Sequence, residues 1–299
     1  ESKTEYLLGN PYASAIDIHK FLDDNASVLE GSIQLWQQWS GVSHTTTEYE
    51  GGYAQVNKTG SVRAYQFEGA EGGHTGSQDG TKTPTRYLPV GQSFMAEVVG
   101  NGSVEFNNSQ RIFIKESAAN GGYNNGSVFF REGDSKARTG DEISSGPTMR
   151  KIRLEFNAMD GQATRRELLL GFSNMTTDGY DYGYEAKNTD DNHDDLYLPL
   201  GDDKMTIQSY GEMTIDKVVP LSLKTSGVNS YTIHATEFDN IAEDQEVYLR
   251  DSVTNTYFDL KEEGAVYTFT SDAGEFTDRF SMVFTSEEDT SLSTEDIAV

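Results

Sequence analysis

The densest group of chemically active side chains in this sequence is an acidic run at residues 178–203, DGYDYGYEAKNTDDNHDDLYLPLGDD. Nine of its side chains are carboxylates, and a single lysine, Lys187, opposes them. Ca²⁺ binds hard oxygen ligands of this kind and takes about 6–8 of them at about 2.3–2.6 Å. Without a cation, so many carboxylates would repel one another and loosen the loop. The run therefore favours a calcium site.

The ligands of such a site are predicted from charge density, because the EF-hand loop template does not fit the run. Asp190, Asn192 and Asp194 alternate as in an EF-hand, but Asp195 stands where that loop needs glycine and Gly201 where it needs glutamate. The alternative is a solvated acidic loop in an already acidic protein. The predicted metal ligands are Asp178, Asp181, Asp190, Asp191, Asp194 and Asp195.

Aromatic side chains indicate a second kind of chemistry, the binding of carbohydrate. Trp and Tyr rings stack on sugar faces while neighbouring polar groups bond the hydroxyls. Tyr180, Tyr182 and Tyr184 have the spacing of a strand, which would put them on one face beside the acidic run. Trp36 and Trp39 lie in LWQQW and would point to opposite faces of a strand. These five residues are the predicted glycan-binding set. The alternative is an ordinary sheet face, on which alternating tyrosines cover the core.

Sequence patterns that carry catalysis are absent. The chain has no HExxH, no Gly-x-Ser-x-Gly, no phosphate-binding glycine loop and no cysteine. Its 5 histidines lie far apart. Glycoside hydrolysis needs two suitably spaced carboxylates, but among 49 acids some pair meets that requirement by chance. Such a pair is therefore almost no evidence for this activity. We therefore expect no enzyme.

The net charge limits the partners. With 23 Lys and Arg against 49 Asp and Glu, the formal net charge is −26. Such a surface repels nucleic acid and anionic membrane, so we expect neither nucleic-acid binding nor membrane insertion. No apolar run approaches the about 18 residues that a spanning helix needs.

Short aromatic and β-branched runs, separated by clusters of Gly, Asn, Ser and Thr, predict an all-β protein. The pattern is typical of antiparallel sandwiches and jelly rolls. In the first two thirds of the chain the predicted strands are 32–39, 52–57, 61–69, 93–99, 102–107, 111–117, 127–132, 151–159 and 166–173.

A change of texture near residue 205 predicts two domains. We expect a jelly-roll-like antiparallel sandwich at 1–205, an immunoglobulin-like sandwich at 206–286 and an acidic linker at 287–299. One short N-terminal helix is predicted at 15–24, with Ser14 as its N-cap. The segment DSVTNT at 251–256 predicts a hairpin connection.

Four separated motifs carry a family resemblance. In order they are GNPYASAIDIHKFLDDN, GGYAQVN with LPVGQSFMAEV after it, LLLGFSNMTTDGYDYGYEAK, and the series VPLSLKT, YTIHATEFDN and VYLRDSVTNTYFDLKEEGAVYTFTSDAGEFTDRF. Together they resemble the C-terminal region of large secreted or surface proteins of the Bacteroidetes, especially marine flavobacteria. In those proteins this region precedes a type IX secretion sorting domain.

The resemblance implies export, a cell-surface or extracellular location and a modular array of β-sandwiches. It also implies the type IX secretion machinery as a partner, through a sorting domain beyond this chain, and it implies no catalytic residues. We therefore expect a non-catalytic structural or adhesive module that Ca²⁺ stabilises. The alternative is a carbohydrate-binding module of a polysaccharide-degrading system, with polysaccharide or cell-surface components as partners.

Overall fold

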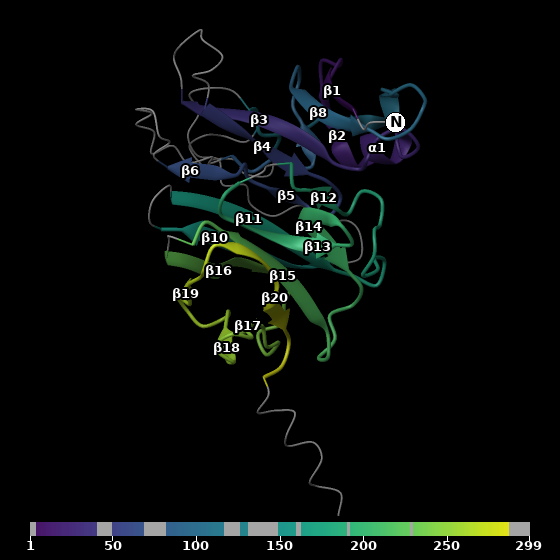
Figure 1. Cartoon of the computed structure of the whole chain (residues 1–299). Coiled ribbons are helices and arrows are strands. Elements are labelled where there is room, and N and C mark those ends of the chain that lie inside the picture. Colours follow the sequence, from purple (N-terminus) through teal and green to yellow (C-terminus); the bar gives the residue numbers. More distant parts are fainter. Residues whose placement is uncertain are drawn as a thin grey trace, which may run out of the picture.

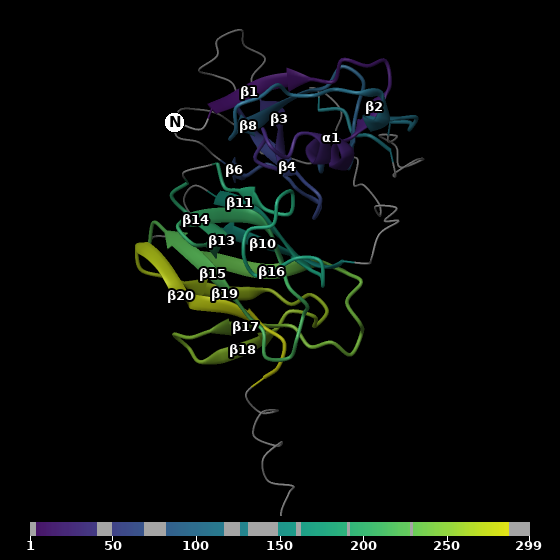
Figure 2. The same ribbon diagram turned by 90° about the vertical axis from the view of Figure 1, so that its right-hand side faces the viewer.

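The computed structural model describes residues 4–40, 50–68, 82–116, 126–130, 149–159, 163–189, 192–227 and 230–286. In these ranges almost all regular structure is β-strand, accompanied by one α-helix and a short 3-10 helix. The predicted all-β class is therefore confirmed. Figures 1 and 2 show two stacked parts, which we call the N-terminal part (residues 4–130) and the C-terminal part (residues 149–286).

Two small antiparallel sheets build the N-terminal part. In the order of their pairing, the five-stranded sheet contains β1 (Thr4–Gly9), β8 (Ser93–Val98), β3 (Ile33–Ser40), β4 (Glu50–Val56) and β5 (Ser61–Val62), and the three-stranded sheet contains β7 (Tyr87–Leu88), β2 (Ala15–Asp17) and β9 (Arg111–Ile112).

The core of the N-terminal part lies between these sheets and helix α1 (Ile18–Asp24). Alternate residues of each strand point to the same face, so one face of the five-stranded sheet contributes its apolar side chains to this core. Phe21 of the helix is fully buried, and its ring contacts Phe94 and Phe106 at centroid distances of 5.5 and 5.1 Å. The helix thus closes one end of the core.

The helix begins later than the sequence pattern predicts. Residues 15–17 form β2 instead, because both of its edges pair with neighbouring strands. The N-cap is Asp17 rather than Ser14, and its Oδ1 accepts a hydrogen bond from the His19 amide at 3.1 Å. Arg86 also binds the Asp17 carboxylate with two bonds, at 2.8 and 2.7 Å.

Residues 102–107 and 127–130, which belong to two of the predicted strands, do not form strands. Residues 102–107 run irregularly into the 3-10 helix η2 (Asn108–Gln110), where Asn107 and Gln110 form a capping box. Of the predicted strand at 127–132, residues 127–130 are described, and they make one isolated bridge, between Glu116 and Ser127. The Asn107 side chain binds the backbone locally, which competes with ladder pairing.

The C-terminal part is built on one continuous sheet that folds over on itself. Its pairs are antiparallel except for the parallel pair β11–β14. Along the sheet the strands are β18 (Thr256–Asp259), β17 (Tyr248–Asp251), β20 (Gly274–Val283), β15 (Val218–Thr225), β13 (Asp195–Leu200), β14 (Asp203–Tyr210), β11 (Ala163–Phe172), β10 (Arg150–Ala158), β16 (Ser230–Asp239) and β19 (Tyr267–Thr270), while β12 (Ala186–Lys187) pairs with β14 and β6 (Gln66–Glu68) with β11.

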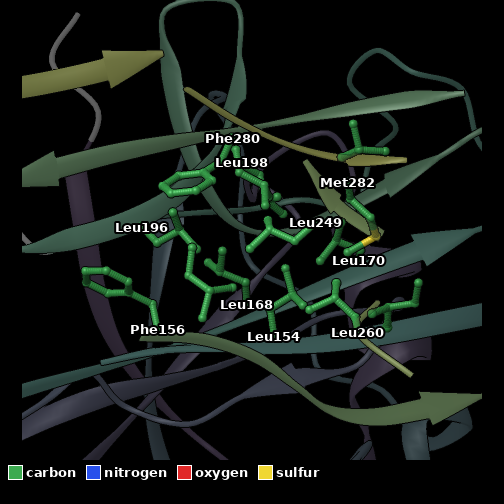
Figure 3. Packing of buried hydrophobic residues seen from close by; sticks show 14 of the residues in the cluster. Leu154, Phe156, Leu168, Leu170, Leu196, Leu198, Leu249, Leu260, Phe280 and Met282 are labelled. Atoms are coloured by element: carbon green, nitrogen blue, oxygen red, sulfur yellow. The ribbon is translucent and has the colours of Figure 1, made fainter. Parts of the chain in front are cut away.

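Strand β13 is the fold line between the two leaves of this sheet, because it pairs with β14 in one leaf and with β15 in the other. The C-terminal core lies between the leaves. In Figure 3, side chains of β10 and β11 such as Leu154 and Leu168 point toward those of β13, β17 and β20. The arrangement is a β-sandwich, and the hairpin predicted at 251–256 joins β17 to β18.

The side of the sandwich opposite β13 is closed by a buried polar group. Arg279 of β20 binds Asp251 of β17 at 3.0 Å and donates to the Thr270 carbonyl of β19, also at 3.0 Å. The Tyr267 hydroxyl of β19 donates to Asp251 at 3.0 Å. Because β17 and β20 belong to one leaf and β19 to the other, these bonds join the two leaves where no strand does.

The predicted division at residue 205 does not coincide with the division between cores. Residue 205 lies inside β14, and one buried cluster runs from Ile152 to Phe284 across it. The second cluster runs from Ile16 to Phe130. The cores therefore divide between residues 130 and 149. The change of texture near 205 therefore falls within one sandwich. The predicted linker at 287–299 lies outside the described residues.

Candidate functional site

The acidic and tyrosine-rich run predicted as a site begins in a segment that joins the two parts. We call residues 176–188 the joining segment; it follows β11 and ends in β12, which Figure 1 places between the two parts. Residues 182–184 form a turn instead of the predicted strand, and the Tyr184 amide donates to the Asp181 carbonyl at 3.0 Å. The three alternating tyrosines therefore do not share the face of a strand.

Two of these tyrosines anchor the joining segment to the N-terminal part. The Tyr180 hydroxyl donates to the Glu30 carbonyl, and the Tyr182 hydroxyl donates to the Leu22 carbonyl at 3.0 Å. Burial raises the pKa of both phenols, so both stay protonated donors at neutral pH. Backbone carbonyls thus occupy the hydroxyls that a sugar would need.

Lys58 binds the same segment from the side of β4 and β5. Its amide donates to the Gly183 carbonyl at 2.7 Å, and its ammonium lies 5.5 and 5.6 Å from the ring centroids of Tyr182 and Tyr184. The ammonium also pairs with Asp23 of α1. A cation over two rings adds stabilisation that depends on the ring orientation, so Lys58 and the turn hold each other in place.

Glycine permits the close approach at this point. Gly31 has a φ of 110°, and a Cβ placed on it would lie 2.7 Å from the Gly183 amide nitrogen. Gly183 itself has a φ of 84°. Since L side chains rarely adopt this backbone conformation, both positions need glycine for the two parts to touch here.

Below the turn, a small apolar cluster is surrounded by hydrogen bonds. The Gln55 amide of β4 donates to the Lys187 carbonyl at 2.6 Å and accepts from the Thr206 hydroxyl of β14. The Thr59 hydroxyl donates to the Tyr184 carbonyl at 2.7 Å. The cluster between these bonds contains Val62, Leu169, Ala186 and Ile207, one residue from the N-terminal part and three from the C-terminal part.

A buried group of arginines and glutamates completes the junction, by which we mean all these contacts between the two parts. Arg63 binds Glu167 at 2.9 Å and Glu155 at 3.0 Å, while Arg153 binds Glu167 at 2.7 Å and the Ser61 carbonyl at 2.6 Å. Burial alone would raise the pKa of Glu167, but the charges of Arg153 and Arg63 outweigh burial and lower it. Glu167 is therefore a charged link between the parts.

One acid of the joining segment is held differently. Glu185 is 1% exposed, and its Oε2 accepts a hydrogen bond from the Asp181 amide at 2.8 Å. Burial raises the pKa of Glu185 to about 8, and the charges of Asp181 and Glu30 contribute. The carboxyl is therefore largely protonated at neutral pH.

The acids at the start of the predicted calcium set accept hydrogen bonds from the protein. Asp178 accepts from the Gly211 amide at 3.0 Å and from the Lys217 ammonium, and that ammonium lowers the pKa of Asp178. Asp181 accepts from the Thr177 amide at 2.6 Å and from the Thr177 hydroxyl at 3.0 Å.

Asp194 and Asp195, at the other end of the run, are both buried. Asp194 accepts from the Ser226 amide and the Tyr231 hydroxyl, each at 2.7 Å, and so joins the start of β13 to the β15–β16 connection and to β16. Asp195 accepts two bonds from Arg166, at 2.7 and 2.8 Å. These carboxylates brace the sandwich.

The described residues do not gather the predicted metal ligands in one place. Asp178 and Asp181 lie in the joining segment, Asp194 and Asp195 lie at the start of β13, and Asp190 and Asp191 fall outside the described residues. Within the described ranges, no group of three or more His, Asp and Glu residues is placed to hold a metal ion. Calcium binding stays a prediction.

The predicted tryptophans lie apart from the tyrosines, in β3. Trp36 is 38% exposed, and its indole contacts Tyr53 of β4 with ring centroids 5.0 Å apart. The backbone of Trp39 lies in β3, and its side chain is outside the described residues. The predicted glycan-binding set is therefore divided between the junction and a separate sheet face.

Comparison with known families accounts for almost the whole chain. One family model matches residues 1–284, with the description "Domain of unknown function (DUF8693)". The chain belongs to this family. No curated protein and no solved structure matches it. Family membership thus extends across both cores and the junction but brings no function with it.

The sequence interpretation missed several residues of the junction. Arg63, Glu155 and Glu167 stand at alternate positions to apolar residues in runs that otherwise read as core strands. Such a charge indicates a strand covered on both faces, with one face buried against polar partners. That signal was present in SVRAYQ, KIRLEF and RRELLL.

Among the described residues, no helix is both long and apolar enough to span a bilayer.

Proposed function

We propose that this chain is a non-catalytic structural and adhesive module of an exported cell-surface protein, whose two cores act as one stiff unit. The observation that carries the structural role is the joining segment, because Tyr180 and Tyr182 use their hydroxyls to hold the other part's backbone. Export and surface location rest on the resemblance of the four motifs.

Stiffness follows from the kinds of contact in the junction. Backbone hydrogen bonds, a buried ion group and an apolar cluster act together, and β6 adds a strand from the N-terminal part to the edge of β11. Relative motion is the default across an interface between independent domains. Here β6 pairing with Ala163–Arg165 opposes such motion by ladder bonds.

Differential scanning calorimetry tests the coupling of the two cores. We expect the wild-type chain to unfold in one transition, with equal calorimetric and van't Hoff enthalpies. A triple variant, Lys58→Ala with Tyr180→Phe and Tyr182→Phe, removes three anchors of the joining segment without cutting into either core. We expect its transition to separate into two.

A matched control changes the same residue types away from the junction, as Tyr6→Phe with Tyr87→Phe and Lys115→Ala. These residues lie in β1, in β7 and after β9. We expect the control to keep a single transition. Two transitions in the wild-type chain, or the same separation in the control, would contradict the structural role.

A further inference from the structure

One face of the five-stranded sheet points away from the N-terminal core, and we call it the outer face. Strand pairing places Trp36 opposite Tyr53 and Leu7 opposite Met95, while Glu5 lies opposite Glu97. The alternate residues of the same strands, Leu8, Leu35, Ala54, Phe94 and Ala96, pack in the core. The outer face therefore carries an aromatic pair, two aliphatic side chains and carboxylates.

The outer face is covered at one end and open at the other. Gln34 and Gln55, which pair across β3 and β4, are buried, and Gln55 is bonded to the C-terminal part. Two residues further along β3, Trp36 is 38% exposed, and Leu7 of β1 is 70% exposed. An apolar surface thus begins where the junction ends.

The indole of Trp36 lies over Gly51 of β4. A Cβ placed on Gly51 of β4 would lie 2.4 Å from Cζ2 and 2.8 Å from Cε2 of the Trp36 ring, so the ring covers the place where that side chain would stand. The same Cβ would lie 2.5 Å from the Gln37 carbonyl oxygen, so Gly51 cannot be replaced without moving backbone. The ring thus lies against Gly51 and remains 38% exposed.

Polar groups lie beside this ring. The Tyr53 side chain contacts it, and burial, with a smaller contribution from the charge of Glu5, raises the pKa of Tyr53, so its hydroxyl remains a donor. Ser93, which is exposed at the start of β8 and belongs to the same face, adds a hydroxyl.

We propose that the outer face, centred on Trp36 and Tyr53, binds a neutral polysaccharide. A pyranose ring has an apolar C–H face that fits one indole and a rim of hydroxyls that fits a phenol and a serine. Glu5 and Glu97 on this face, and the net charge of −26, oppose sulfated or uronic-acid polymers. Charge thus selects neutral sugars.

Affinity electrophoresis tests the proposal with the full chain. Gels contain laminarin, mannan, xylan or hydroxyethyl cellulose as neutral probes, and alginate or dextran sulfate as anionic probes. We expect at least one neutral polymer to retard the protein and neither anionic polymer to do so. A chain retarded by no neutral polymer, or only by the anionic ones, overturns the proposal.

Variants locate the binding surface. Trp36→Ala is expected to weaken the apparent affinity by about tenfold or more, as truncation of a central aromatic contact does. Phe113→Ala is the matched control, because Phe113 is a 94% exposed aromatic outside this face. We expect it to bind like the wild type. Equal loss in both variants, or none in Trp36→Ala, contradicts the assignment.

Ser93→Ala keeps the test decisive if Trp36→Ala does not fold. Ser93 is exposed at the start of β8, so its truncation leaves the core intact while removing a hydroxyl of the outer face. We expect several-fold weaker retention with an unchanged thermal midpoint, and unchanged retention would argue against the proposed face. The structural role is tested separately, because a chain that unfolds in one transition and is not retained refutes only the glycan site.

Discussion

The joining segment and the outer face of the five-stranded sheet are both rich in aromatic side chains, yet their surroundings differ. In the joining segment, the Tyr180 and Tyr182 hydroxyls donate to carbonyls of the other part. On the outer face, Trp36 lies over Gly51 and is partly exposed to solvent. Aromatic content alone therefore does not distinguish a binding surface from an internal contact. The distinction depends on whether the aromatic side chain is bonded to another part of the protein or exposed to solvent.

The same comparison applies to charge. Acids of the junction are buried and have specific partners, as Glu167 has in Arg63 and Arg153. Acids of the outer face such as Glu5 are exposed. Changes in the junction should therefore alter the stability of the fold, and changes on the outer face should alter binding.

The largest loss of stability is expected when the buried ion group is broken. Glu167→Gln leaves Arg63 and Arg153 without their shared charge and should cost about 3–5 kcal/mol. Glu237 provides the other carboxylate that binds Arg153, and the side chain of Glu237 is 55% exposed. Glu237→Gln should therefore cost at most about 1 kcal/mol. Urea unfolding measures both. Similar losses in the two variants would show that the junction does not depend on the buried charge.

Stability is expected to depend on pH through Glu185. Its pKa is raised from 4.5 to about 8 in the folded protein, so the folded state binds more protons than the unfolded state between these values. The free energy of unfolding should be highest below pH 4.5 as far as this group is concerned, fall as the pH rises toward 8, and then level off.

Thermal midpoints of the wild type and Glu185→Gln across this range measure that contribution. The variant cannot ionise there, so its curve should be flatter than that of the wild type. Carboxyls whose pKa is lowered in the folded protein, such as Asp178, change the stability only at pH values near and below the ordinary pKa of a carboxyl. They therefore do not mask the effect of Glu185. Parallel curves for the two proteins would mean that Glu185 does not carry the pH dependence.

A smaller loss is expected from one hydroxyl of the joining segment. Tyr182→Phe removes the bond to the Leu22 carbonyl and should cost about 1 kcal/mol. Tyr6→Phe, in the exposed strand β1, should change stability by less than about 0.5 kcal/mol. Chemical denaturation of the pair measures the difference. Equal values would remove the distinction between tyrosines inside and outside the junction.

Local features of the fold could be predicted from the sequence, whereas pairings between distant strands could not. The alternation in KIRLEF correctly predicts β10, with Ile152, Leu154 and Phe156 in the core, because side-chain direction in a strand is a local property. The division at 205 does not coincide with the division between the two cores, because the partners of β14 include β11, earlier in the chain, and β13, next to it. Pairing of that kind depends on the whole chain.

The site shows the same limit at single residues. The spacing of Tyr180, Tyr182 and Tyr184 suits a strand, but Gly183 among them adopts a positive φ and turns the chain. Gly179 and Gly183, which flank most of that run, were the available signal for a turn. No local signal indicates that the carbonyls of residues 22 and 30 would accept the hydroxyls.

The smallest effect is expected from removal of divalent cations. The four described acids of the predicted calcium set already accept bonds from protein groups, so their repulsion is relieved without a metal. EDTA should therefore leave the thermal midpoint unchanged, and added Ca²⁺ should not raise it. A ligand at a hundredfold excess over its Kd would add about 2.7 kcal/mol, which such a scan detects easily. A rise with Ca²⁺ that Asp190→Asn with Asp191→Asn abolishes would instead assign a cation to those two residues, and would make the acidic run a metal site beside the junction.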